Sequence, residues 1–124
     1  MSQASEFHNI DNPDDGLFRE LGEGLTTRIF SGEHAMLSIV TIAPNCQGTL
    51  HHHPEEQWGV LLEGSCVRIQ NGEEVECVVG EFWCSPGNSV HGIRAGAQGC
   101  TVLDIFSPPR EEYKKAGSGF GDAK

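Results

Sequence analysis

The chain has 124 residues, of which 18 are acidic and eight are lysine or arginine, so its formal net charge is −10. This length fits one compact domain, and without a lysine- or arginine-rich run the chain is a poor partner for nucleic acid or an anionic membrane. No apolar run is long enough to span a bilayer, and the polar, acidic start lacks the basic and apolar regions of a signal peptide. We therefore expect a cytoplasmic protein that binds a small molecule or another protein.

Short apolar runs rich in Val, Ile, Leu and Phe alternate with 16 glycines and six prolines. This pattern is typical of strands joined by tight turns. The strongest turn signal is Asn71-Gly72, because both residue types tolerate the positive φ of a type I′ hairpin. We predict an all-β fold with strands at residues 25–30, 34–43, 49–53, 57–64, 66–70, 74–79, 81–85, 89–95 and 100–107.

The two ends of the chain look different from its middle. We expect residues 1–24 to form an N-terminal arm that is partly ordered or wraps the domain, residues 25–112 to form the β domain, and residues 113–124 to form a flexible tail. The segment "PPREEYKKA" (108–116) predicts a short C-terminal helix that begins at proline. An unprotected sheet edge invites a partner strand, so we expect a homodimer.

The segment "HHHPEEQ" contains the densest group of metal-binding side chains. Side chains alternate across a strand, so His51 and His53 are expected to share one face while His52 points to the other. Pro54 ends the pairing, and Gln57 at the start of the next strand can offer its amide oxygen to the same face. The two glutamates in the turn are competing ligands. From the residues alone, a solvated histidine-rich turn is the alternative to a metal site.

The stretch around these histidines resembles the first motif of the cupins, which are small jelly-roll β-barrels. In that motif a glycine is followed by His-x-His, then by glutamate or glutamine, and then by a second glycine. Here Asn45 stands in the position of the leading glycine, followed by His51, His53, Gln57 and Gly64. The spacing back from Gly64 favours Gln57 over the glutamates.

A second cupin motif, glycine, Pro-x-Gly and histidine, resembles "GEFWCSPGNSVH", with Gly80, Pro86, Asn88 in place of glycine, and His91. Asparagine is the residue that best tolerates a left-handed backbone after glycine, so this departure weakens the match little. The resemblance implies a cupin double-stranded β-helix, that is, a jelly-roll barrel. It also implies one metal ion held by His51, His53, Gln57 and His91.

Three neutral imidazoles and an amide oxygen suit a divalent transition metal, for which we consider Ni, Zn, Fe and Mn. Because glutamine replaces glutamate, the protein contributes no negative charge to this ligand set. A bound ion therefore keeps its full positive charge for polarising a substrate oxygen.

The last strand carries an acid among apolar residues. Asp104 shares a face with Phe106, and a carboxylate in such a strand is expensive unless it is paired or functional, so Asp104 is a candidate general acid or base. Arg110 follows two prolines and is a candidate clamp for a substrate carboxylate. The alternative is that Asp104 and Arg110 form a structural pair that ties down the C-terminal segment.

Over residues 40–113 the chain also resembles the KdgF group of single-domain cupins, through "HHHPEEQ", "VLLEG", "SPGNSVHG" and "LDIFSPPREEY". This resemblance implies a metal-dependent isomerase of carbohydrate metabolism that converts a 4,5-unsaturated uronic acid, an anionic sugar, to its open-chain keto form. It implies that Asp104, Phe106 and Arg110 line the substrate site. Two alternatives remain: an iron-dependent cupin dioxygenase, and a non-catalytic cupin that binds a small ligand.

Overall fold

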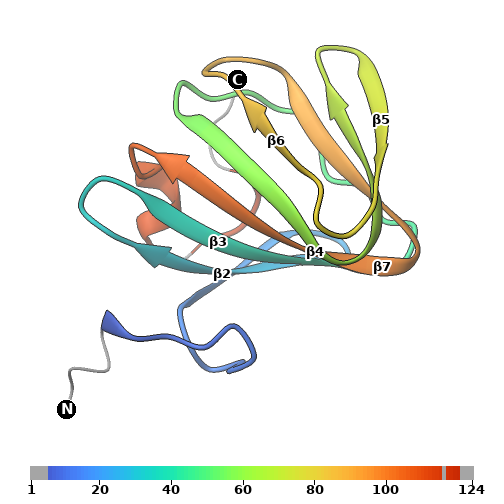
Figure 1. Cartoon of the computed structure of the whole chain (residues 1–124). Helices are drawn as coiled ribbons and strands as arrows, with labels where there is room; N and C mark the ends of the chain where they lie inside the picture. Colours follow the sequence, from blue (N-terminus) through green and yellow to red (C-terminus); the bar gives the residue numbers. More distant parts are fainter. Residues whose placement is uncertain (1–5, 116, 121–124) are drawn as a thin grey trace.

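A computed structural model describes residues 6–115 and 117–120 of the protein, and within these ranges the named elements are seven strands and one short helix. Figure 1 shows how they are arranged. The elements are β1 (Leu17–Gly22), β2 (Leu25–Ser31), β3 (Met36–Ile42), β4 (Glu56–Gln70), β5 (Glu73–Cys77), β6 (Phe82–Ser85), β7 (His91–Ser107) and the 3-10 helix η2 (Glu111–Lys114). This composition confirms the predicted all-β fold. The predicted C-terminal helix shrinks to the four residues of η2.

All strand pairs are antiparallel, in the order β1-β2-β3-β7-β4-β5, with β6 added to the free edge of β4. The long strands β4 and β7 run side by side through most of the molecule (Figure 1). One half of β4 pairs with β6 and the other half with β5, so the sheet curls into the jelly-roll barrel. Alternate residues of β2 and β3 fill the interior, among them Leu25, Ile29, Met36 and Val40.

The expected strands 57–64 and 66–70 are one bent strand, and so are 89–95 and 100–107. The reason is Gly64, which has φ +80 and whose missing Cβ would lie 2.0 Å from the carbonyl oxygen of Gly99. The register between β4 and β7 shifts on both sides of this contact, so the ladder bulges and bends without stopping. The glycine-rich residues 96–99 therefore continue a strand instead of forming the turn that their composition indicates.

Three asparagines adopt the left-handed backbone conformation. Asn71 (φ 50) and Gly72 (φ 85) form the predicted hairpin turn between β4 and β5. Asn45 (φ 62) and Asn88 (φ 68), which stand where the two cupin motifs have glycine, also have positive φ. Asparagine thus meets the backbone requirement that glycine meets in the motif.

Both ends of the described chain pack onto the barrel. Residues 17–22 form the edge strand β1, and the Arg28 side chain donates to the carbonyl oxygens of Ile10 and Asn12. Arg19 on β1 donates to carbonyl oxygens of the C-terminal segment, including those of Ser118 and Gly119. The division at residues 24 and 112 remains a prediction. None of the described helices is long and apolar enough to cross a membrane.

Candidate metal centre

Three histidines converge inside the barrel. The ligand-capable nitrogen atoms of His51, His53 and His91 all lie within 4.8 Å of one another, while His52 is outside this group. The expected strand 49–53 is a single bridge, in which the backbone N–H groups of His51 and His91 each donate to the other's carbonyl oxygen over 3.0 and 2.9 Å. Beyond this bridge the Asn88 N–H donates to the His53 carbonyl oxygen over 2.7 Å, and Pro54 follows His53.

Each of the three rings is oriented by a backbone carbonyl oxygen two residues away. The Nδ1 atoms of His51, His53 and His91 lie 2.8, 3.0 and 3.0 Å from these acceptors, which belong to Thr49, Glu55 and Ser89. Because a carbonyl oxygen only accepts, each Nδ1 carries the proton and each Nε2 keeps its lone pair. The Nε2 atom of His91 is buried and has no hydrogen-bond partner among the described residues.

Burial keeps these imidazoles neutral. It lowers the pKa of His51 to about 4 and that of His91 to about 2, and it also lowers the pKa of His53. Neighbouring arginines contribute to the same direction, namely Arg110 for His51 and His53, and Arg68 for His91. The neutral form is the one that binds a metal ion.

Gln57 lies on the side of the histidines that faces the centre, and the two glutamates do not. The Oε1 atom of Gln57 lies 3.0 Å from Nε2 of His53, on the inner side of the ring. If His53 is protonated on Nδ1, these two atoms are both acceptors, an arrangement that a shared cation stabilises. Glu55 lies instead on the Nδ1 side of His53, at 3.4 Å, and Glu56 accepts a hydrogen bond from the exposed Trp58. The donor set therefore fits a divalent transition metal, with Gln57 as the fourth predicted ligand.

Asp104 and Phe106 lie on the same stretch of β7, beside this centre. Asp104 pairs with Gly59 across the sheet, and its Oδ1 atom lies 2.9 Å from the position that a Cβ of Gly59 would take. Burial raises the pKa of Asp104 to about 6, against the opposing effects of Arg68, Gln57 and Arg110. The Phe106 ring meets the His53 ring edge-on, with their centroids 5.6 Å apart.

Arg110 is 1% exposed, and its guanidinium lies over the Tyr113 ring, 4.3 Å from the centroid. Its Nη2 donates to the carbonyl oxygen of Phe120 over 2.5 Å. Its Nε and Nη1 are buried without a hydrogen-bond partner, and it does not line the small cavity that His51 and His91 share. Its role as a carboxylate clamp remains a prediction.

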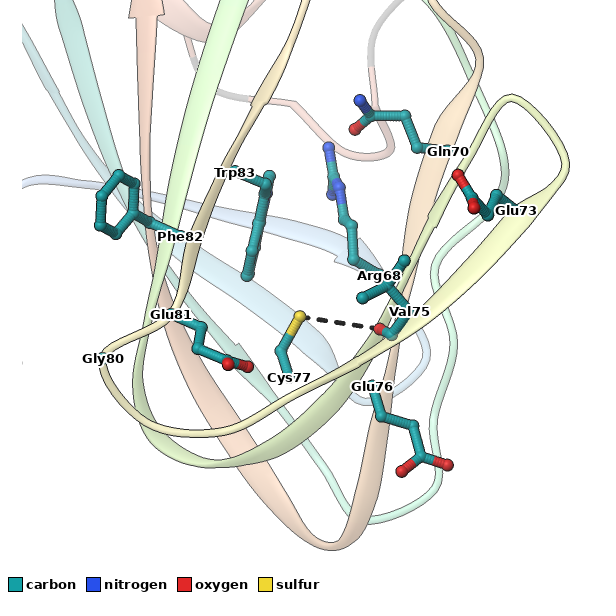
Figure 2. Close-up of a pocket in the computed structure, with 10 residues that line it drawn as sticks. All are labelled: Arg68, Gln70, Glu73, Val75, Glu76, Cys77, Gly80, Glu81, Phe82 and Trp83. Atoms are coloured by element: carbon teal, nitrogen blue, oxygen red, sulfur yellow. Dashed lines mark hydrogen bonds between the residues drawn. The ribbon is translucent and has the colours of Figure 1, made fainter.

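Two spaces adjoin the centre. A cavity of about 30 Å³ is lined by His51, Gln57, His91 and Asp104. A groove of about 550 Å³ lies between β5 and β6, with Trp83 and Phe82 on one side and Val75 on the other (Figure 2).

Sequence reasoning missed two residues of this region. Arg68 lines both spaces, and its signal was an arginine that alternation places on the same face as Cys66 in "CVRIQ". Phe120 stacks on His51, with ring centroids 4.4 Å apart. No local pattern marks Phe120, because it lies in a glycine-rich segment that we expected to be flexible.

Comparison with known proteins agrees with this architecture. A family model described as a cupin domain matches residues 38–106. The pectin degradation protein KdgF of Dickeya dadantii (strain 3937) is 28% identical over 102 residues, which are 81% of this chain and 93% of that protein. KdgF from Halomonas sp. superposes with a TM-score of 0.72 at 25% identity and covers 80% of this chain and 94% of its own.

An RmlC-like cupin from Shewanella frigidimarina NCIMB 400 superposes with a TM-score of 0.75 at 20% identity, covering 86% of this chain and 96% of its own. At this identity the likeness concerns the fold alone. The family match spans more than half of the chain and includes the first histidine pair, Gln57 and His91. The chain belongs to the cupin domain family.

Proposed function

We propose that this cupin is a metal-dependent isomerase that converts a 4,5-unsaturated uronic acid to its open-chain keto form. The observation that carries the proposal is the meeting of two kinds of group in one cavity. His51, His91 and Gln57 line it as predicted metal ligands, and Asp104 lines it with a raised pKa of about 6. The similarity to a protein named for pectin degradation points to the same class of substrate.

The reaction is a rearrangement without net gain or loss of atoms. The ring bond between C1 and the ring oxygen breaks as the C1 hydroxyl loses its proton, which leaves an aldehyde at C1 and an enolate at C5. The enolate then gains a proton at C4 and becomes a ketone at C5. The proton that leaves one oxygen is thus balanced by the proton that arrives at carbon.

Asp104 is suited to move these protons. A carboxyl group with a pKa of about 6 is present in both protonation states near neutral pH, so it can accept and return a proton. A divalent ion held by the three imidazoles would stabilise negative charge that develops on a substrate oxygen. Phe106 packs against His53 and lines the same cavity as Asp104.

The test uses the whole chain loaded in turn with Ni, Zn, Mn and Fe(II), mixed with unsaturated galacturonate. We expect loss of the double-bond absorbance with at least one metal. Asp104→Asn should slow the reaction by about 100-fold or more, the scale on which general acid–base groups act. His51→Ala should lower the metal content, and the rate should fall with it. The matched control is His52→Ala, which removes the neighbouring histidine that lies outside the triad.

Unchanged absorbance with all four metals would contradict the proposal. Consumption of O2 that depends on Fe(II) would replace it with the dioxygenase alternative. The homodimer, the cytoplasmic location and the identity of the metal are separate predictions, and this assay leaves them open.

A further inference from the structure

Arg68 is a buried arginine whose hydrogen bonding is incomplete. Its side chain is 5% exposed, and its Nη2 donates to the Ser85 hydroxyl over 2.7 Å. Its Nη1 reaches the carbonyl oxygen of Gly92 only at 3.5 Å, and its Nε is buried without a partner. Within residues 6–115 and 117–120, no carboxylate oxygen lies within 4.0 Å of this guanidinium.

A buried charge without a directly bonded counter-ion destabilises the protein that contains it, and the Asp104 carboxylate only partly opposes the lowering of the Arg68 pKa by burial. The surroundings nevertheless hold Arg68 in place. Ser85 is fully buried and donates its own hydroxyl proton to Gln70, and the Gln70 amide donates to the carbonyl oxygen of Cys84 over 2.9 Å. This chain of hydrogen bonds fixes the guanidinium before any ligand arrives, which lowers the entropic cost of binding an anion.

The position of Arg68 connects the metal cavity with the groove. It lines the cavity of about 30 Å³ together with His51, Gln57, His91 and Asp104. It also lines the groove of about 550 Å³, where Figure 2 shows its side chain beside the Trp83 ring. The guanidinium lies 5.3 Å from the centroid of that ring.

The sizes of the two spaces indicate what each can hold. The small cavity has room for about two water-sized groups, so it is too small for a sugar ring. The groove is in the size range of small-molecule sites and offers an aromatic ring as a flat apolar wall. Three acids, Glu73, Glu76 and Glu81, also line the groove, which favours a ligand with a single negative group over a polyanion.

We propose that Arg68 binds the carboxylate of the substrate at the metal cavity, while the uncharged part of the ligand lies in the groove against Trp83. The identity of the ligand as a uronate rests on the proposed function. This assigns the carboxylate to Arg68, which lines the metal cavity. Arg110 also has two buried nitrogens without a hydrogen-bond partner, Nε and Nη1, but it does not line this cavity.

Calorimetric titration of the metal-loaded protein with galacturonate and with galactose tests the proposal. The wild type should bind galacturonate more tightly than the uncharged sugar. Arg68→Met should weaken galacturonate binding by about 10- to 150-fold, the loss typical of hydrogen bonds to charged groups, and leave galactose binding unchanged. The galacturonate affinity of Arg68→Lys should lie between those of the wild type and Arg68→Met, because lysine keeps the charge but lacks the planar guanidinium.

Arg94→Met is the matched control, since Arg94 is a partly exposed arginine paired with Glu74, and it should bind both sugars as the wild type does. The melting temperature of Arg68→Met should not fall, because the variant removes an unpaired buried charge and Ser85 keeps Gln70 as its partner. If Arg68→Met does not fold, the galacturonate affinities of Arg68→Lys and the wild type are compared instead.

Equal galacturonate affinity of the wild type and the Arg68 variants would overturn the inference, as would a wild type without preference for galacturonate over galactose. Turnover of unsaturated galacturonate separates this outcome from failure of the proposed function. If binding depends on Arg68 and no turnover occurs, the inference stands and the proposed reaction fails. If turnover occurs and Arg68→Met leaves KM unchanged, the reaction stands and the inference fails.

Discussion

Arg19 on β1 and Arg68 on β4 are buried to the same degree, each being 5% exposed, but their surroundings differ. All three nitrogens of the Arg19 guanidinium donate to backbone oxygens, those of Gly119, Glu112 and Ser118 among them, at 2.8 to 3.0 Å. Arg68 has one good acceptor and one unpartnered nitrogen.

The difference indicates whether a buried arginine stabilises the fold or is available to bind a ligand. A guanidinium whose donors are all satisfied by the chain stabilises the fold, and its removal leaves acceptors without partners. A guanidinium with unsatisfied donors destabilises the fold, and these donors find hydrogen-bond partners only when a ligand binds. His91, Asp104 and Arg110 also have buried atoms without hydrogen-bond partners, so the same reasoning applies to them.

The largest effect on stability is expected from Arg19→Met. This variant removes the hydrogen bonds that join β1 to the C-terminal segment, and it should lower the free energy of unfolding by about 3 kcal/mol. Urea denaturation of the metal-free protein measures the loss. Arg68→Met is the comparison, since it removes the same side chain from an equally buried place and should cost little. Equal losses in the two variants would remove the distinction between the two regions.

The next largest effect is the pH dependence of Asp104→Asn. Burial raises the pKa of Asp104 to about 6 from 3.8, so the folded state binds more protons than the unfolded state between these values. The wild type is therefore free of this penalty below pH 4 and carries it in full above pH 6. The free energy of unfolding of Asp104→Asn, relative to that of the wild type, should therefore rise by about 2 kcal/mol between pH 4 and pH 8.

Paired denaturation curves of the metal-free proteins across this pH range measure that gain. The histidines titrate in both proteins, so their contribution cancels in the difference. A difference that stays constant from pH 4 to pH 8 would mean that Asp104 has an ordinary pKa, and its role as the proton carrier would lose its support.

The smallest effect on stability is expected from Phe120→Ala. The Phe120 ring stacks on His51 with an interplanar angle of 27°, a contact that contributes about 1 kcal/mol or less. Its removal should uncover the metal cavity, so a bound ion should be released to a chelator several times faster. Phe18→Ala is the control, because Phe18 is 62% exposed. Equal release rates would show that Phe120 does not cover the centre.

The sequence was most informative where the chemistry is local. The histidine triad follows from short motifs, and the two asparagines that replace motif glycines have the positive φ that the motif needs. The split of β4 into two strands was wrong because the bend at Gly64 depends on Gly99, 35 positions away. Arg68 was not predicted as a site residue, because the alternation of side chains along strands was used only to find apolar faces. The same alternation places this arginine on the interior face of the barrel.

The clamp around Arg19 joins atoms that are 100 residues apart in the chain. Contacts of such separation form after the local hairpins, because closing a long loop costs more entropy than closing a short one. The strand pairs of the barrel join residues at most 70 positions apart, as Met36 and Phe106 are, so we expect them to form first. We therefore expect the segment that carries Phe120 to dock after the barrel and to detach before it in local unfolding, which would open the centre to solvent while the barrel stays folded.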